Sequence, residues 1–100
     1  MAAYIIVEVA VRDPVRYERY KELVPASIAA YGGRFIVRGG AVEALEGEWK
    51  PGRLVILEFP SAERARAWWS SPEYAEAKAL RLATANSKML LVEGLPPVTG

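Results

Sequence analysis

The sequence predicts an α+β domain in which a four-stranded antiparallel sheet carries its helices on one face. Two observations lead to this prediction. Apolar runs typical of strands and helical patterns follow one another in the order βαββαβ, and proline, glycine and serine signals separate them. With 100 residues, 52% of them apolar and 25% charged, the chain has the length and composition of one globular domain with a single core.

The first strand and the first helix are predicted near the N-terminus. Residues 4–11 are a near-continuous apolar run with one charge, typical of a strand packed on both faces. Asp13 and Pro14 supply an N-cap and a first helical residue. We expect a kink or a restart at Pro25, which cannot donate an amide hydrogen bond, and a helix end at the glycine pair 32–33.

The central strands are predicted over residues 34–38 and 53–59. The glycine pair 39–40 indicates a bulge or a bend, and the pattern leaves open a resumption of the strand over residues 41–46. Residues 47–52, which contain a tryptophan and a proline, are predicted to form the loop of a hairpin.

The second helical region is predicted to be broken in two, because two N-cap signals occur in succession. Ser61 begins a short helix, and a second helix follows over residues 71–83. Residues 87–93 form the last predicted strand. A single domain is therefore expected over residues 1–94, followed by a tail, residues 95–100, that should be poorly ordered unless a partner holds it. This order of elements is that of the ferredoxin-like split βαβ unit.

Alternation along the strands assigns side chains to the two faces of the sheet. One face is purely apolar and should lie under the helices: Ile5, Val7, Val9, Val11, Val55, Leu57 and Phe59. The open face mixes aliphatic side chains with carboxylates: Tyr4, Ile6, Glu8, Leu54, Ile56, Glu58, Met89, Leu91 and Glu93. Such a surface favours a homodimer formed through the open face, with the carboxylates in a wet cavity or paired with Arg34 or Arg38. The alternative is a monomer with scattered exposed aliphatic residues.

The chain contains no histidine and no cysteine. It therefore offers no thiolate nucleophile, imidazole base, histidine-ligated haem or usual zinc or iron–sulfur site, and we expect no cofactor and no metal. A formal charge of +1 favours neither nucleic acid nor an anionic membrane as a partner, and no apolar run is long enough to cross a membrane. The N-terminus lacks a signal-peptide pattern, so a cytoplasmic location is expected.

Five separated motifs occur in a characteristic order within residues 4–94. They are Tyr31-Gly32-Gly33-Arg34-Phe35, Val37-Arg38-Gly39-Gly40, Leu45-Glu46-Gly47, Leu57-Glu58-Phe59-Pro60 and Ser71-Pro72-Glu73-Tyr74. Together they closely resemble the bacterial family catalogued as domain of unknown function 1330. The resemblance implies a ferredoxin-like protomer that pairs through its sheets into the dimeric α/β barrel also used by cofactor-free monooxygenases. Relatives of that fold that bind haem or use a base commonly do so through histidine, which is absent here.

Glu8 and Glu58 are the candidate acid–base residues, because they occupy similar places on strands that lie side by side in this topology. Burial and mutual repulsion would favour the protonated form of one of them, as a general acid or base requires. The structural alternative is that each carboxylate caps the open face or bridges to an arginine across the dimer.

Arg38 is the candidate anchor for a substrate carboxylate, because its planar guanidinium binds such groups with two hydrogen bonds and the glycines beside it allow close approach. It is equally well explained as a charged strand end.

Aromatic residues of the two helical regions are candidates for lining a cleft between helices and sheet, with a tyrosine hydroxyl orienting the reacting oxygen: Tyr17, Tyr20, Trp68 and Tyr74. Aromatic residues at helical spacing are more often core.

The positions of the three tryptophans predict which of them are buried. Trp68 and Trp69 are adjacent, about 100° apart around a helix, so only one can point fully into the core. Trp49 in the hairpin loop is expected to cover a neighbouring subunit or a pocket.

Two functions remain open from the sequence. One is a cofactor-free enzyme that oxygenates or transfers protons on a small acidic or aromatic metabolite, with Tyr17, Glu8 or Glu58 in catalysis. The other is a dimer that binds or senses a small ligand without chemistry.

Overall fold

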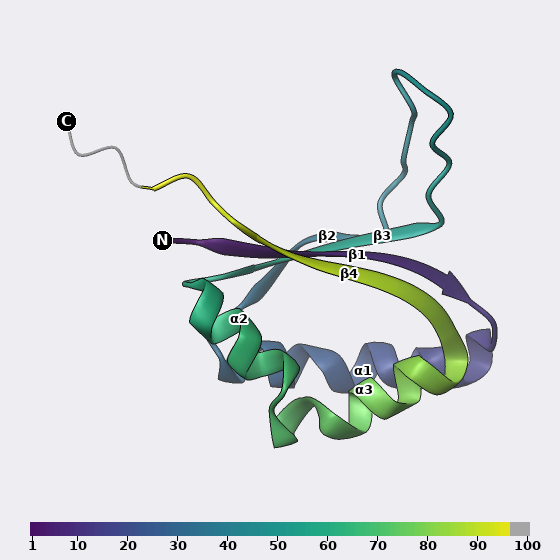
Figure 1. Ribbon diagram of the computed structural model, residues 1–100. Helices are drawn as coiled ribbons and strands as arrows, with labels where there is room; N and C mark the ends of the chain where they lie inside the picture. Colours follow the sequence, from purple (N-terminus) through teal and green to yellow (C-terminus); the bar gives the residue numbers. More distant parts are fainter. Residues whose placement is uncertain (97–100) are drawn as a thin grey trace.

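The computed structural model describes residues 1–96 and confirms the predicted order of elements. The elements are β1 (Ala3–Val11), α1 (Pro14–Ala30), β2 (Arg34–Arg38), β3 (Arg53–Phe59), α2 (Ala62–Trp69), α3 (Pro72–Thr84) and β4 (Ala85–Glu93). The strands form one antiparallel sheet in the order β2-β3-β1-β4. All helices lie on one face of the sheet, and the other face is open (Figure 1). Positions 97–100 of the predicted tail lie outside the described residues.

The helices begin at the predicted caps. The Asp13 carboxylate accepts a hydrogen bond from the backbone N–H of the third residue after it, at 3.1 Å. The Ser61 and Ser71 hydroxyls do the same at 3.1 Å and 3.2 Å. Because two such caps occur in succession, the second helical region is divided into α2 and α3, as predicted.

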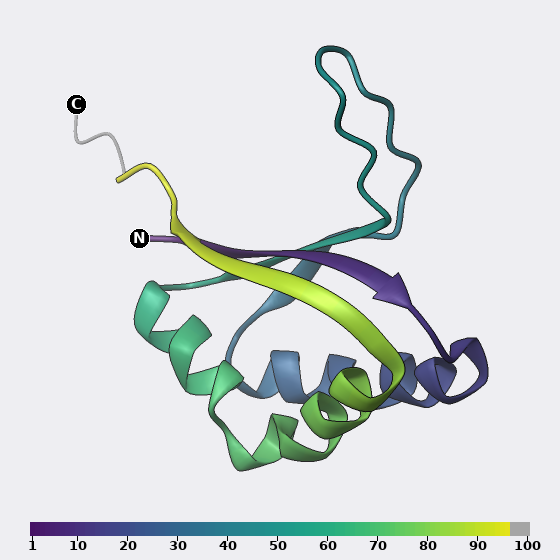
Figure 2. The ribbon, with the colours of Figure 1, turned by 45° about the vertical axis from the view of Figure 1, so that its right-hand side comes forward.

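Two possibilities that the sequence offered for the first half of the chain are not formed. Helix α1 runs without a break through Pro25, so the helix does not restart there. Residues 41–46 form no strand. Instead, residues 39–52, which we call the arm, form one long excursion that projects from the sheet on the side away from the helices (Figures 1 and 2).

The assignment of faces in β4 was wrong by one position. Met89 pairs with Val7 and Leu91 pairs with Ile5, so Met89 and Leu91 lie on the helix-covered face, while Leu90 lies on the open one. The run from Met89 to Val92 is apolar at both parities, so alternation cannot choose between the faces. Only the pairing with β1 decides, and a slip of one residue inverts every side chain.

A β-bulge in β2 sets the direction of Arg38. Phe35 pairs with Leu57 and Arg38 pairs with Val55, and both partners belong to the core. Residues three apart in a regular strand face opposite sides, but the extra residue Ile36 restores Arg38 to the side of Phe35. The Arg38 guanidinium accordingly lies 4.3 Å from the centre of the Phe35 ring. Of the two possibilities predicted for the glycine pair 39–40, the bend is the one found, at Gly39 with φ of 73°, and the bulge lies earlier, at Ile36.

The core between the layers is centred on Trp68, of which 1% is exposed. Its ring stacks on Tyr74 at 4.1 Å and packs against Phe59 at 5.5 Å. The indole N–H donates to the hydroxyl of Ser27 at 3.1 Å, so the polar atom of this buried ring is satisfied. Trp69 is 45% exposed, which confirms that only one of the adjacent tryptophans enters the core.

Gly33, the residue before β2, gives a test of this packing. A Cβ on Gly33 would lie 2.5 Å from Phe59 Cε1 and 2.9 Å from Ile28 Cγ2. Gly33→Ala should therefore lower the free energy of unfolding by about 1–3 kcal/mol. Gly40→Ala is the matched control, because nothing lies within 4 Å of a Cβ there. Urea denaturation of both variants measures the difference, and equal midpoints would contradict the packing described.

Candidate functional site

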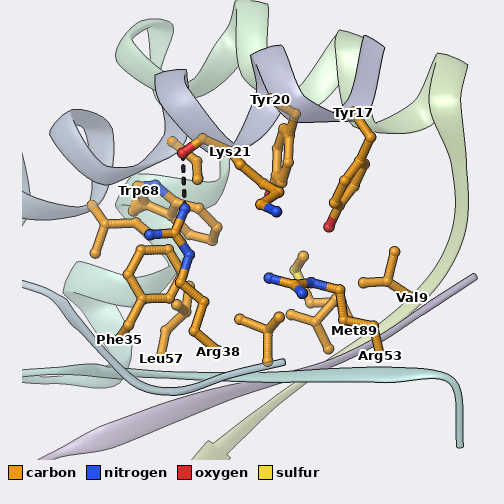
Figure 3. Close-up of a pocket in the computed structure, with 14 residues that line it drawn as sticks. Val9, Tyr17, Tyr20, Lys21, Phe35, Arg38, Arg53, Leu57, Trp68 and Met89 are labelled. Atoms are coloured by element: carbon orange, nitrogen blue, oxygen red, sulfur yellow. Dashed lines mark hydrogen bonds between the residues drawn. The ribbon is translucent and has the colours of Figure 1, made fainter. Parts of the chain in front are cut away.

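A cavity lies between α1 and the helix-covered face of the sheet (Figure 3). We call this region the cleft. Its volume of about 20 Å³ has room for a single water molecule. Its walls are mostly apolar, and they include Val24, Ile28, Val55, Leu57 and Met89. Arginine, lysine and tyrosine side chains also line it, so a mainly apolar cavity carries a few convergent polar groups.

Arg53 carries the one buried polar side-chain atom of the described residues that lacks a hydrogen-bond partner, its Nε. It is the first residue of β3 and pairs with the buried Val9, so its side chain enters the cleft from the sheet (Figure 3). Its Nε is buried and makes no hydrogen bond. A buried charged donor without an acceptor costs about 1–3 kcal/mol or more. An oxygen acceptor inside the cleft would remove that cost.

Gly39 makes room for Arg53. A Cβ at position 39 would overlap the Arg53 guanidinium, and the φ of 73° at Gly39 favours glycine as well. The Arg-Gly-Gly motif therefore admits a neighbouring arginine, a role that the sequence interpretation did not include. Arg53 itself was missed, although it shares the parity of Val55 and Leu57, and an arginine in phase with an apolar face is a signal that could have identified it.

Arg38 reaches across the mouth of the cleft. Its Nη2 donates to the backbone carbonyl of Lys21 in α1 at 2.8 Å (Figure 3). In a regular helix that carbonyl would accept from the N–H of the residue four positions later, which is Pro25 and has no N–H. Arg38 therefore supplies the donor that Pro25 lacks, and it ties β2 to α1.

Tyr17 and Tyr20 line the cleft from α1. The Tyr17 hydroxyl points toward Arg53 (Figure 3). Burial raises the pKa of Tyr17, although the positive charge of Arg53 opposes that rise. Burial, with a smaller contribution from Tyr74, raises the pKa of Tyr20 strongly. Both phenols therefore stay protonated at neutral pH, and they can donate a hydrogen bond but cannot act as bases.

Tyr74 lies behind the cleft and does not line it. Its hydroxyl is 3.3 Å from that of Tyr20 and accepts a hydrogen bond from Arg81 Nε at 3.1 Å. Arg81 is 5% exposed and also donates to Ser87 Oγ. Of the aromatic residues proposed for such a cleft, Tyr17, Tyr20 and Trp68 line it, whereas Tyr74 supports Tyr20 from behind. Arg38 lines it too and so lies away from the open-face carboxylates that the sequence offered as its partners.

The cleft is electropositive. Within residues 1–96, neither Arg38, Arg53 nor Arg81 forms an ion pair with a carboxylate. Three guanidinium groups in and behind one small cavity attract an anion and disfavour a cation.

Glu8 and Glu58 lie on the open face, and the structure does not bring them together. Glu8 pairs with Leu54, and Glu58 pairs with Tyr4, so they are four positions apart along the sheet, or about 13 Å. The prediction of a close carboxylate pair is therefore wrong, because it took no account of the antiparallel register. Glu58 accepts a hydrogen bond from Arg34 Nε of the same protomer at 2.8 Å, and Arg34 is one of the two arginines that the sequence offered as partners of the open-face carboxylates.

Residues 1–96 lack two further features that would indicate a function. No cluster of three or more acidic side chains that could hold a metal ion is found there. In the same part of the chain, no helix combines the length and the apolar character needed to cross a membrane.

Comparison with known proteins places this fold in a family. The family model described as Domain of unknown function (DUF1330) matches residues 2–95. No curated protein matches the chain.

Solved structures with the same fold include proteins with and without a known activity. A protein of unknown function from Rhodopseudomonas palustris is 20% identical, with a TM-score of 0.76 over 96% of this chain and 84% of its own. A dimeric ferredoxin-like protein of unknown function from Jannaschia sp. CCS1 is 12% identical, with a TM-score of 0.70 over 94% and 100%. SnoaB, a cofactor-independent oxygenase from Streptomyces nogalater, is 15% identical, with a TM-score of 0.66 over 99% and 98%.

The pairing of Arg38 with the carbonyl left free by Pro25 can be tested by a double-mutant cycle. Arg38→Met should cost about 1 kcal/mol of unfolding free energy in the wild-type background. In a Pro25→Ala background the cost should be smaller, because the new N–H at position 25 bonds to the Lys21 carbonyl. The control is Arg19→Met, which removes an exposed arginine of α1 and should cost the same in both backgrounds. Equal costs of Arg38→Met in the two backgrounds would contradict the pairing.

The raised pKa of Tyr20 predicts that the folded protein loses stability at alkaline pH. The pKa of Tyr20 is raised in the folded chain, so above pH 10 the unfolded chain releases this proton first. The free energy of unfolding therefore loses nothing to Tyr20 below pH 10, and above pH 10 it falls by up to about 1.4 kcal/mol per pH unit. Urea unfolding between pH 8 and about 11 should show a steeper fall for the wild type than for Tyr20→Phe. Parallel curves, offset only by the lost hydroxyl contact, would contradict the assignment.

Proposed function

This chain belongs to the family described as Domain of unknown function (DUF1330), and we propose that it binds a small acidic metabolite with an apolar or aromatic body in the cleft. One observation carries the proposal: the Nε of Arg53 is buried in a mainly apolar cavity and has no acceptor. A carboxylate or another anionic oxygen would satisfy it. The apolar walls would then receive the body of the metabolite.

Binding requires the cleft to widen, because its present volume admits one water molecule. The bond from Arg38 to the Lys21 carbonyl is the contact that ties the mouth together. Hydrogen bonds between ionised partners are roughly twice as strong as neutral ones, so an entering carboxylate offers Arg38 a better acceptor than the carbonyl. We propose that Arg38 exchanges the carbonyl for the ligand while Arg53 holds the same anionic group from below.

The same residues support chemistry on the bound molecule. Where the anionic group in the cleft is itself an enolate or phenolate oxygen, Arg38, Arg53 and the protonated Tyr17 stabilise it, and so they favour loss of the metabolite's own acidic proton to solvent. Addition of O₂ to that anion forms a C–O bond, and one proton completes a hydroperoxide, so the balance needs no further reductant. The fold shared with the cofactor-independent oxygenase SnoaB supports including O₂ as the co-substrate.

Binding without chemistry is the second candidate, and one feature of the cleft favours it. None of the described residues that line the cleft carries a carboxylate or an imidazole, so no side chain there is suited to act as a base at neutral pH. A protein that only binds or senses the metabolite needs no such group.

We also propose that the protein is a homodimer formed through the open face of the sheet. That face exposes Ile36, Leu90 and Val92 by 44%, 65% and 45%, an apolar surface that a second copy would cover. The description of the Jannaschia structure as dimeric supports this assembly.

Titration calorimetry with benzoate, and with the uncharged benzamide as its matched control, tests the anion site. Wild-type protein should bind benzoate and not benzamide, and Arg53→Met should weaken benzoate binding at least about 10-fold. Arg16→Met, which removes an exposed arginine of α1, should bind as the wild type does. In urea, Arg53→Met should be no less stable than the wild type, because it removes a buried unpaired donor. Equal affinities for benzoate and benzamide would overturn the proposal.

Oxygen uptake and recovery of the ligand separate the two candidates. Aromatic acids that carry a phenol or an enolisable ketone are incubated with the wild type, Arg53→Met and Glu58→Gln. Uptake that is lost in Arg53→Met and kept in Glu58→Gln supports catalysis in the cleft. Binding with full recovery of the unchanged ligand supports the sensing role.

A further inference from the structure

The arm is an apolar extension that its own protomer leaves uncovered. It leaves the sheet after β2, returns at β3 and projects beyond the open face in both views (Figures 1 and 2). Val42 is 47% exposed, Trp49 65% and Leu45 87%. Large side chains at the tip of a loop gain nothing from this exposure, and they indicate a surface that another molecule covers.

The apolar side of the arm is continuous with the open face of the sheet. Val42, Leu45, Trp49 and Pro51 line one hollow, and the same hollow includes Leu54. Leu54 pairs with Glu8 and therefore belongs to the open face. Glu43 and Glu46 line the hollow as well, so a molecule that covers the open face meets an arm that is apolar with a few carboxylates.

The charge of the arm matches that of a second copy. The arm carries Glu43, Glu46 and Glu48 against the single cation Lys50, whereas the whole chain has a formal charge of +1. The rest of the chain therefore holds an excess of cations. Opposite net charges of the arm and of the rest of the chain favour the approach of one copy's arm to the body of another.

We infer that the arm of one copy packs against the body of a second copy and so extends the interface formed by the open faces. This inference rests on the proposed homodimer. In a two-fold dimer the contact is made twice, each arm on the other body. Because the arm joins Arg38 to Arg53, its attachment to a second copy also fixes the ends of the strands from which both cleft arginines project.

Sedimentation equilibrium of three proteins tests the inference: the wild type, Leu45→Glu and Val15→Glu. Val15 is the matched control, an 81% exposed aliphatic residue on α1, on the side of the sheet that the dimer does not use. Leu45→Glu should raise the dimer dissociation constant at least about 10-fold, and Val15→Glu should leave it unchanged. Circular dichroism checks that both variants fold.

Tryptophan fluorescence gives a second readout in the Trp69→Phe variant, where Trp49 is the remaining exposed tryptophan and Trp68 is buried. Acrylamide should quench Trp49 in the dilute monomer and quench it less in the dimer. A wild-type protein that stays monomeric would overturn the proposed homodimer and this inference with it. A stable dimer in which Leu45→Glu dissociates like the wild type and Trp49 stays accessible would overturn the arm contact alone.

Discussion

The pairing register between β2 and β3 is the constraint on which the cleft depends. The extra residue Ile36 turns Arg38 to the helix-covered face, where its guanidinium lies over Phe35 and reaches the carbonyl of Lys21. Without the bulge, Arg38 would project from the open face, and the carbonyl released by Pro25 would lose its donor. A strand irregularity and a helix irregularity thus compensate each other, and both are local to the mouth of the cleft.

Stability and the proposed ligand binding make opposite demands on the cleft. The protein buries the Nε of Arg53 without an acceptor and buries Arg81 with only neutral hydroxyl partners. Such groups disfavour folding unless an anion meets them. Trp68, which forms one wall of the cleft, packs on Phe59 and Tyr74 and donates a hydrogen bond to Ser27. These satisfied contacts hold the helices on the sheet. Unpaired buried polar groups that are confined to one cavity, among described residues that otherwise pack and pair well, are typical of a binding site.

Features that depend only on neighbouring residues could be predicted from the sequence. The caps at Asp13, Ser61 and Ser71 and the bounds of β2 and β3 follow from residue type and alternation, and they are confirmed. What depends on register could not be predicted in the same way: the separation of Glu8 from Glu58 is a property of paired strands, as are the faces of β4 and the direction of Arg38. Among the cleft residues, Arg53 was within reach, since parity alone assigns it to the covered face.

The proposed arm contact and the proposed ligand site are linked through covalent structure. The chain passes from Arg38 directly into the arm and from the arm directly into Arg53, so any restraint on the arm acts on the strand ends that carry these side chains. If a widened cleft and a held arm favour each other, the ligand must tighten the dimer by the same factor by which the dimer tightens ligand binding. If the arm moves independently of the strand ends, the ligand does not change the dimer affinity and the dimer does not change the ligand affinity. The size of this coupling therefore measures whether the second copy is part of the binding site or only a neighbour of it.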